Sequence, residues 1–164
     1  MFGNSLNAVQ FCLAPVYVVV HKDQKDDFIN ETKNAVSDYF TDLKDNDDYT
    51  SIINQNHYDR LQDLLNDAVE KGATIDEINP ANEDFSQQEH FKIPPTIVSN
   101  TTDDMKIMQE EIFGPLLPVV EYDEIDEATK LINSKDRPLG LYYFGNDQSC
   151  LLYTSDAADE RSWG

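Results

Sequence analysis

The sequence is poor in cysteine and in long apolar runs. Its 164 residues include two cysteines, Cys12 and Cys150, whose spacing fits neither a metal-ligand pattern nor a disulfide framework. No apolar run approaches the roughly 20 residues that span a bilayer. The N-terminus lacks the basic segment and apolar stretch of a signal peptide. These absences predict a cytoplasmic protein in a reducing compartment, without a membrane partner.

Basic residues are also scarce. Twelve lysines and arginines stand against 32 aspartates and glutamates, for a formal net charge of −20. A field of that sign repels phosphate backbones and anionic lipid, so we expect no nucleic-acid partner. The three histidines, His21, His57 and His90, are too dispersed to indicate a metal site. The length fits one ordinary domain, and the 40% of apolar residues can supply its core.

The apolar pattern predicts an α/β protein with a largely parallel sheet flanked by helices. Short runs that are apolar on both faces alternate with amphipathic segments, which is typical of parallel strands covered by helices. We expect the first strand, Val16 to Val20, to be buried on both faces. Further strands are expected over residues 73–78, 96–98, 116–120 and 139–144.

Three helices are predicted between these strands, over residues 26–40, from Asn54 to Gly72, and over the stretch that contains Ile125 and Ile132. Asp23, Asn54 and Asp123 are the expected N-caps, because their side chains can accept a bond from a free backbone N–H. Gly72 stands where a helix stop belongs. Residues 105–111 are expected to form a helical turn.

Two stretches carry residues suited to a binding or catalytic site. Residues 110–115 place a carboxylate pair, Phe113, a glycine and a proline in one corner, which can hold an aromatic ring and a carboxylate in a fixed relation. An ordinary turn between a helix and a strand explains the same residues. Cys12 precedes a predicted strand, where most cysteines are small core residues. A nucleophile would need a stabilised thiolate, and no cation lies near Cys12 in the sequence.

Together the two stretches resemble the aldehyde dehydrogenase superfamily. Residues 109–118, QEEIFGPLLP, are similar to its Glu-x-Phe-Gly-Pro motif, and residues 7–12, NAVQFC, are similar to its catalytic-cysteine segment, usually Asn-Ala-Gly-Gln-Thr-Cys. Residues 48–61 resemble the branch that acts on coniferyl-type and long-chain fatty aldehydes. The resemblance extends from residue 2 to about 148 and implies a partial aldehyde dehydrogenase catalytic domain over residues 1–149.

The resemblance implies three residue roles and no metal. Cys12 would attack the aldehyde carbonyl, the resulting thiohemiacetal would give hydride to the nicotinamide, and water would cleave the remaining thioester. Glu111 would hold the ribose hydroxyls of the nicotinamide half, since a carboxylate can accept two hydrogen bonds from a diol. Phe113 would pack against the nicotinamide. The implied cofactor is NAD or NADP, the implied substrate is an aldehyde, and a full-length parent is expected to form a homo-oligomer.

Two residues depart from the family's cysteine segment, and large parts of the family's chain fall outside this one. Val9 replaces a glycine and Phe11 replaces a threonine or another small residue; a valine is strained there if the position needs a positive φ. The dinucleotide-binding domain, the general-base glutamate and the oxyanion asparagine are not among the 164 residues. We therefore expect a fragment that is inactive alone. The alternatives are an inactive acidic interaction module of the same fold and an acyl-transferring aldehyde dehydrogenase.

The last residues are predicted to be non-native. Residues 150–160, CLLYTSDAADE, resemble the conceptual translation of a transposase sequencing adapter, while the resemblance to the family stops near residue 148. We therefore expect residues 150–164 to lie outside the domain and Cys150 to have no function.

Overall fold

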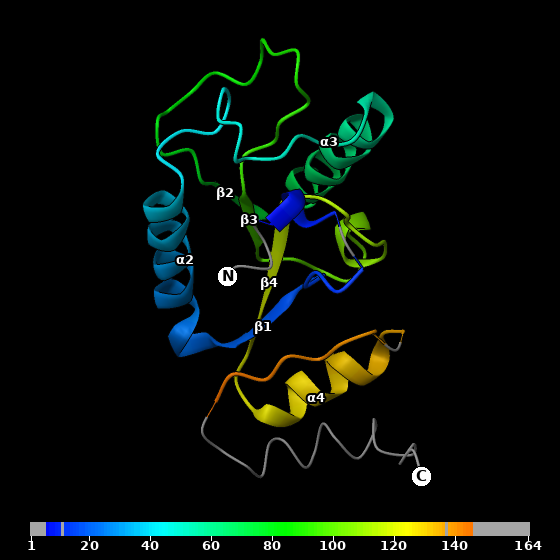
Figure 1. Cartoon of the computed structure of the whole chain (residues 1–164). Helices are drawn as coiled ribbons and strands as arrows, with labels where there is room; N and C mark the ends of the chain where they lie inside the picture. The colour runs from blue at the N-terminus through cyan, green and yellow to red at the C-terminus, as the bar shows by residue number, and fades with distance from the viewer. Residues whose placement is uncertain (1–5, 11, 137, 146–164) are drawn as a thin grey trace, which may run out of the picture. The chain divides into compact units, whose positions relative to one another are not determined.

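Four strands form one sheet in the computed structural model, which describes residues 6–10, 12–136 and 138–145 (Figure 1). The strands are β1 (Val18–His21), β2 (Thr74–Glu77), β3 (Thr96–Ser99) and β4 (Leu116–Tyr122), in the order β1-β4-β3-β2. β3 and β4 run parallel, with Thr96 opposite Leu116, whereas β2 runs antiparallel to β3, with Ile75 opposite Val98. The predicted α/β class with a mostly parallel sheet is confirmed.

Two helices cover opposite faces of this sheet in the unit formed by residues Met1–Glu121 (Figure 1). Successive side chains of a strand point to opposite faces. On β3, Ile97 packs with Ile29 of α2 (Lys25–Tyr39), whereas Val98 packs with Leu61 and Leu64 of α3 (Gln55–Glu70). The α3 face also receives two short 3-10 turns, η1 (Leu6–Val9) and η3 (Lys106–Met108).

The predicted bounds of the first two helices are confirmed to within two residues. The Asn54 side chain caps α3, because its Oδ1 accepts the backbone N–H of His57 at 3.0 Å. Gly72 follows the end of α3 with a φ of +92°, a left-handed conformation that glycine adopts without strain. The sequence signals at Asn54 and Gly72 were therefore sufficient to predict where α3 begins and ends. The turn predicted over residues 105–111 forms over its first part, as η3.

Two predicted caps are wrong. Residues Lys22–Gln24 form a short 3-10 helix, η2, so Asp23 lies inside it and Gln24 takes the N-cap position of α2. In the second unit, Tyr122–Gly164, helix α4 (Ile125–Ser134) begins after Glu124 rather than after Asp123. There the Glu127 carboxylate accepts the backbone N–H of Asp123 at 3.0 Å, one residue before the N-cap position.

Two strand predictions need correction. β1 begins two residues later than expected and its side chains are only half-buried, because β1 stands at an edge of the four-stranded order. Residues 139–144 form no strand, and Phe144 is 91% exposed. A strand needs a neighbour for its N–H and C=O groups, and no described strand pairs with this segment. Among the described residues, no helix is long and apolar enough to cross a membrane.

Candidate functional site

Cys12 is exposed in the loop between η1 and β1. In the turn before it, Asn7, Ala8 and Val9 have φ values of 52°, 48° and 61°. The positive φ that would strain a valine is therefore present at Val9, which is only 3% exposed. The left-handed conformation costs a non-glycine residue roughly 1–2 kcal/mol. Phe11, the other departure from the family's segment, lies outside the described residues.

Gln10 ties the cysteine loop to the segment that leads into α3. Its Nε2 donates to the backbone carbonyl of Ser51 at 3.0 Å, and its Oε1 accepts the backbone N–H of Ile53, also at 3.0 Å. Both ends of the amide are thus used, which fixes its orientation. Since Asn54 is the cap of α3, the residue two positions before Cys12 is bonded next to the start of that helix.

Glu111 and Phe113 lie between η3 and β4, and the Glu111 side chain and part of the Phe113 ring are exposed to solvent. Glu111 is exposed, and no group among the described residues bonds its carboxylate. Phe113 is 36% exposed and has a φ of 47°. Such a conformation costs of order 1–3 kcal/mol and persists only where the surroundings impose it. The corner thus presents a carboxylate that no described residue bonds, together with part of the Phe113 ring, whose backbone is in an unfavourable conformation.

The glycine of the corner is required by its packing on α3. A Cβ placed on Gly114 would lie 2.5 Å from both Cδ1 and Cδ2 of Leu61. Real Cβ atoms essentially never approach that closely. Leu61 is fully buried, so its side chain has little room to turn away. Only glycine lets this corner approach the helix.

Arg60, the neighbour of Leu61, holds the same corner through its backbone. Its Nη1 donates to the carbonyl of Glu111 at 3.0 Å, and its Nη2 donates to the carbonyl of Ile112. The guanidinium also approaches the Glu110 carboxylate, with 4.0 Å between Nη1 and Oε2. One side chain of α3 thus fixes two consecutive peptide groups of the corner.

Asp67, two helical turns further along α3, holds the start of the same segment. Its Oδ2 accepts the backbone N–H of Lys106 at 2.8 Å, and its Oδ1 lies 3.0 Å from Nζ of Lys71. These two bonds lower the pKa of the Asp67 carboxyl below its usual value, because both favour the charged form. The chain from η3 to Gly114 is therefore attached to α3 at both ends.

The two predicted motifs meet in one buried cluster. Ala8 from the cysteine segment and Ile112 from the corner pack in the cluster that contains Ile52 and Leu61. Together with the bonds of Gln10 and Arg60, this places both motifs on residues 51–61. The structure therefore brings together two stretches that are far apart in the sequence.

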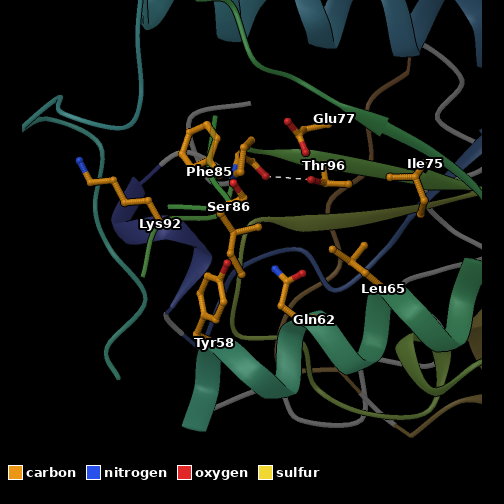
Figure 2. A pocket seen from close by; sticks show the side chains of 11 residues that line it. Tyr58, Gln62, Leu65, Ile75, Glu77, Phe85, Ser86, Lys92 and Thr96 are labelled. Atoms are coloured by element: carbon orange, nitrogen blue, oxygen red, sulfur yellow. Dashed lines mark hydrogen bonds between the residues drawn. The ribbon is translucent and has the colours of Figure 1, made fainter. Parts of the chain in front are cut away.

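A cavity of about 250 Å³ lies elsewhere on the same helix (Figure 2). One side of the cavity is lined by Tyr58, Gln62 and Leu65 of α3. The rest is lined by residues of β2, of β3 and of the loop between these two strands. Cys12, Glu111 and Phe113 do not line this cavity. In the part of the chain that the structure describes, no three His, Cys, Asp or Glu side chains could together hold a metal ion.

Comparison with known proteins decides the family. The sequence model of the Aldehyde dehydrogenase family matches residues 1–159. The chain belongs to the aldehyde dehydrogenase family. Its fold is that of solved family structures: an AldH of Staphylococcus aureus, described as a substrate-bound state, is 35% identical and superposes with a TM-score of 0.80 over 98% of this chain and 33% of its own.

Two curated relatives carry names from the predicted branch. A probable coniferyl aldehyde dehydrogenase of Caulobacter vibrioides is 55% identical over 149 residues, which cover 91% of this chain and 31% of the relative. A coniferyl aldehyde dehydrogenase of a Pseudomonas species is 46% identical over 143 residues, which cover 87% of this chain and 30% of the relative. The chain thus spans about a third of the length of these relatives.

Sequence reasoning gave no role to Gln10 or Arg60. Both lie inside stretches that resemble the family, yet their partners are backbone groups more than 40 positions away. A backbone carbonyl leaves no mark in the residue types of a sequence. The one available signal was the spacing of Arg60 and Asp67, which puts an arginine and an aspartate on one face of a predicted helix.

Proposed function

We propose that this chain is the central catalytic segment of an NAD(P)-dependent aldehyde dehydrogenase that oxidises an aldehyde to a carboxylic acid. The observation that carries the proposal is the attachment of the Cys12 loop and the Glu111 corner to one stretch of chain, residues 51–61, through Gln10 and Arg60. A cysteine nucleophile and a cofactor-binding carboxylate can act on one substrate only if a rigid element holds both.

Cys12 is the proposed nucleophile. Its thiolate attacks the aldehyde carbonyl carbon, a C–S bond forms as the C=O π bond breaks, and the former carbonyl oxygen takes up a proton to give a thiohemiacetal. Loss of hydride from that carbon, with loss of the hydroxyl proton, leaves a thioester, which water hydrolyses to the acid and the free thiol. Sulfur suits both steps, because its thiolate is accessible near neutral pH and its acyl derivative is readily cleaved.

The open surface at the corner fits a nicotinamide cofactor. Glu111 is exposed and its carboxylate has no partner among the described residues, so it can accept two hydrogen bonds from a ribose diol. The partly exposed Phe113 ring offers an apolar surface for the adjacent nicotinamide. When bound, the nicotinamide supplies the acceptor for hydride. Residues of this chain would hold only that half of the cofactor.

The remaining proposals concern the whole enzyme. The relatives named for coniferyl aldehyde make an aromatic, unsaturated aldehyde the first substrate to test. We further propose that the full-length enzyme is a homo-oligomer, that this chain alone is inactive, and that residues 150–164 are not native. Residues 150–164 all lie outside the described residues. A cytoplasmic location stays a prediction.

The test uses a full-length enzyme that carries these residues. With coniferyl aldehyde and NAD or NADP, we expect cofactor reduction that is lost in Cys12→Ser, since an alcohol without an adjacent base is a far weaker nucleophile. Glu111→Gln should raise the KM for the cofactor while leaving the alkylation of Cys12 by iodoacetamide unchanged. Wild-type turnover in the Cys12→Ser variant would contradict the proposal.

A second candidate is an acidic interaction module that keeps the fold without catalysis. The strained Val9, buried three positions before Cys12, is the observation that favours it. The rate of thiol alkylation separates the two: a Cys12 no more reactive than glutathione at neutral pH supports the module, and a faster one supports the enzyme.

A further inference from the structure

The contact between Arg60 and the corner is of an unusual kind. An arginine on a helix surface generally faces a carboxylate or water. Arg60 lies 4.0 Å from the Glu110 carboxylate, and it also donates to two consecutive backbone carbonyls, those of Glu111 and Ile112. The planar guanidinium presents several N–H groups in a rigid fork, and lysine cannot reproduce that geometry. Two fixed peptide groups define the backbone on both sides of Ile112.

This geometry bears directly on the two side chains proposed to hold the cofactor. Glu111 precedes the fixed pair of peptide groups, and Phe113, with its φ of 47°, follows it. Nothing in a phenylalanine favours that conformation, so the surroundings must impose it. Arg60 on one side and the close packing of Gly114 against Leu61 on the other are the contacts that do so.

We propose that Arg60 is a positioning residue for cofactor binding, which acts through the backbone of Glu111 and Ile112 rather than by touching the cofactor. This inference rests on the proposed function of the corner. It predicts a selective effect, because the Cys12 loop is attached to a different part of the chain, through Gln10 to Ser51 and Ile53. Loss of Arg60 should therefore loosen the corner that carries Glu111 and Phe113 and leave the Cys12 loop in place.

The experiment compares Arg60→Met with Lys71→Met in the full-length enzyme. Methionine retains most of the length of either side chain and removes its charge. Lys71 is a matched control: it lies on the same helix and bonds Asp67 and the backbone carbonyl of Asp104, but not the corner itself. We expect Arg60→Met to raise the KM for NAD(P) by about tenfold, the factor that corresponds to one lost charge-assisted hydrogen bond. Lys71→Met should change it by less than about twofold.

Two further readouts separate positioning from a general loss of structure. In Arg60→Met, the KM for the aldehyde and the alkylation rate of Cys12 should stay at the wild-type values. In the 164-residue chain, the amide of Leu116, which donates to the Gly114 carbonyl at 2.8 Å, should exchange hydrogen faster in Arg60→Met, while the amides of β2 should not change. A parallel rise of both KM values, or unchanged exchange at Leu116, would overturn the inference.

Arg60→Lys decides the case if the methionine variant does not fold. It keeps the charge but offers a single ammonium for two carbonyls, so we expect a rise in the cofactor KM that is smaller than for methionine yet outside the range of the control. A wild-type cofactor KM in Arg60→Lys would overturn the inference.

Glu111→Gln tests the proposed function of the corner separately from the inference about Arg60. If this variant binds NAD(P) as the wild type does, the proposed function of the corner fails, and the inference about Arg60 fails with it. If Glu111→Gln weakens cofactor binding and Arg60→Met does not, the proposed function stands and the inference alone is wrong.

Discussion

Replacing Gly114 by alanine tests how the corner is held against α3. The added Cβ would lie 2.5 Å from both terminal carbons of Leu61, about 1 Å or more inside an ordinary carbon–carbon contact. Leu61 is fully buried and cannot move into solvent. Overpacking of this kind costs about 1–3 kcal/mol, so we expect Gly114→Ala to lose that much free energy of unfolding.

The assay is a double-mutant cycle with Leu61→Ala, measured by denaturant unfolding of the chain and followed by circular dichroism. Leu61→Ala alone should cost about 2–5 kcal/mol, because it leaves a cavity in the core. In that background the alanine at position 114 enters the vacated space. It should then be neutral, or stabilising by about 0.4–1 kcal/mol, since alanine restricts the unfolded chain more than glycine does.

Gly72→Ala is the matched control. A Cβ at Gly72 meets nothing within 4 Å, but the φ of +92° strains any other residue. Its cost, of order 1 kcal/mol, should be the same with and without Leu61→Ala, because the two sites share no contact. If Gly114→Ala costs equally much in both backgrounds, the steric argument is refuted.

Two other substitutions test the strain near Cys12 and a buried hydroxyl. Val9→Gly relieves about 1–2 kcal/mol of backbone strain, but it loses a buried side chain worth about 1.5–3 kcal/mol and adds unfolded-chain entropy worth about 0.5–1 kcal/mol. We therefore expect denaturant unfolding to show a free energy of unfolding lower by about 1–2 kcal/mol. A more stable variant would show that strain outweighs burial. The Tyr49 hydroxyl is buried and donates to the Ile93 carbonyl at 2.6 Å, so Tyr49→Phe should cost about 1–3 kcal/mol by leaving that acceptor unpaired. Burial raises the pKa of Tyr49 above its usual value. The contribution of Tyr49 to stability is therefore complete below about pH 10 and is lost as the pH rises further. Tyr49→Phe should lose less stability at alkaline pH than the wild type does, and an unchanged dependence of stability on pH would contradict the role of burial.

Local signals in the sequence were sufficient for the elements that depend on local physics. Asn54 and Gly72 mark the ends of α3 because capping and left-handed stops involve only neighbouring residues. The prediction failed for residues 139–144, whose apolar pattern fits a strand but whose pairing depends on another strand. The half-burial of β1 has the same origin, since position at an edge of the sheet is a property of the whole fold.

The candidate site could be predicted as a set of residue types but not as an arrangement. Cys12, Glu111 and Phe113 follow from the resemblance to the family, and the structure leaves each of them at least partly exposed. The contacts that hold them, from Gln10 and from Arg60, end on backbone groups and so have no counterpart in the residue pattern. Val9 is intermediate: its conflict with a positive φ was predictable, but its burial was not.

The mass of the Cys12 peptide during turnover tests whether Cys12 is the nucleophile. A full-length enzyme that carries these residues is mixed with coniferyl aldehyde and NAD or NADP, quenched in acid and digested. We expect the peptide with Cys12 to gain the mass of the acyl group in the wild type, and Cys12→Ser to show neither the adduct nor the acid product. Formation of the carboxylic acid in Cys12→Ser, at the wild-type rate, would contradict this expectation.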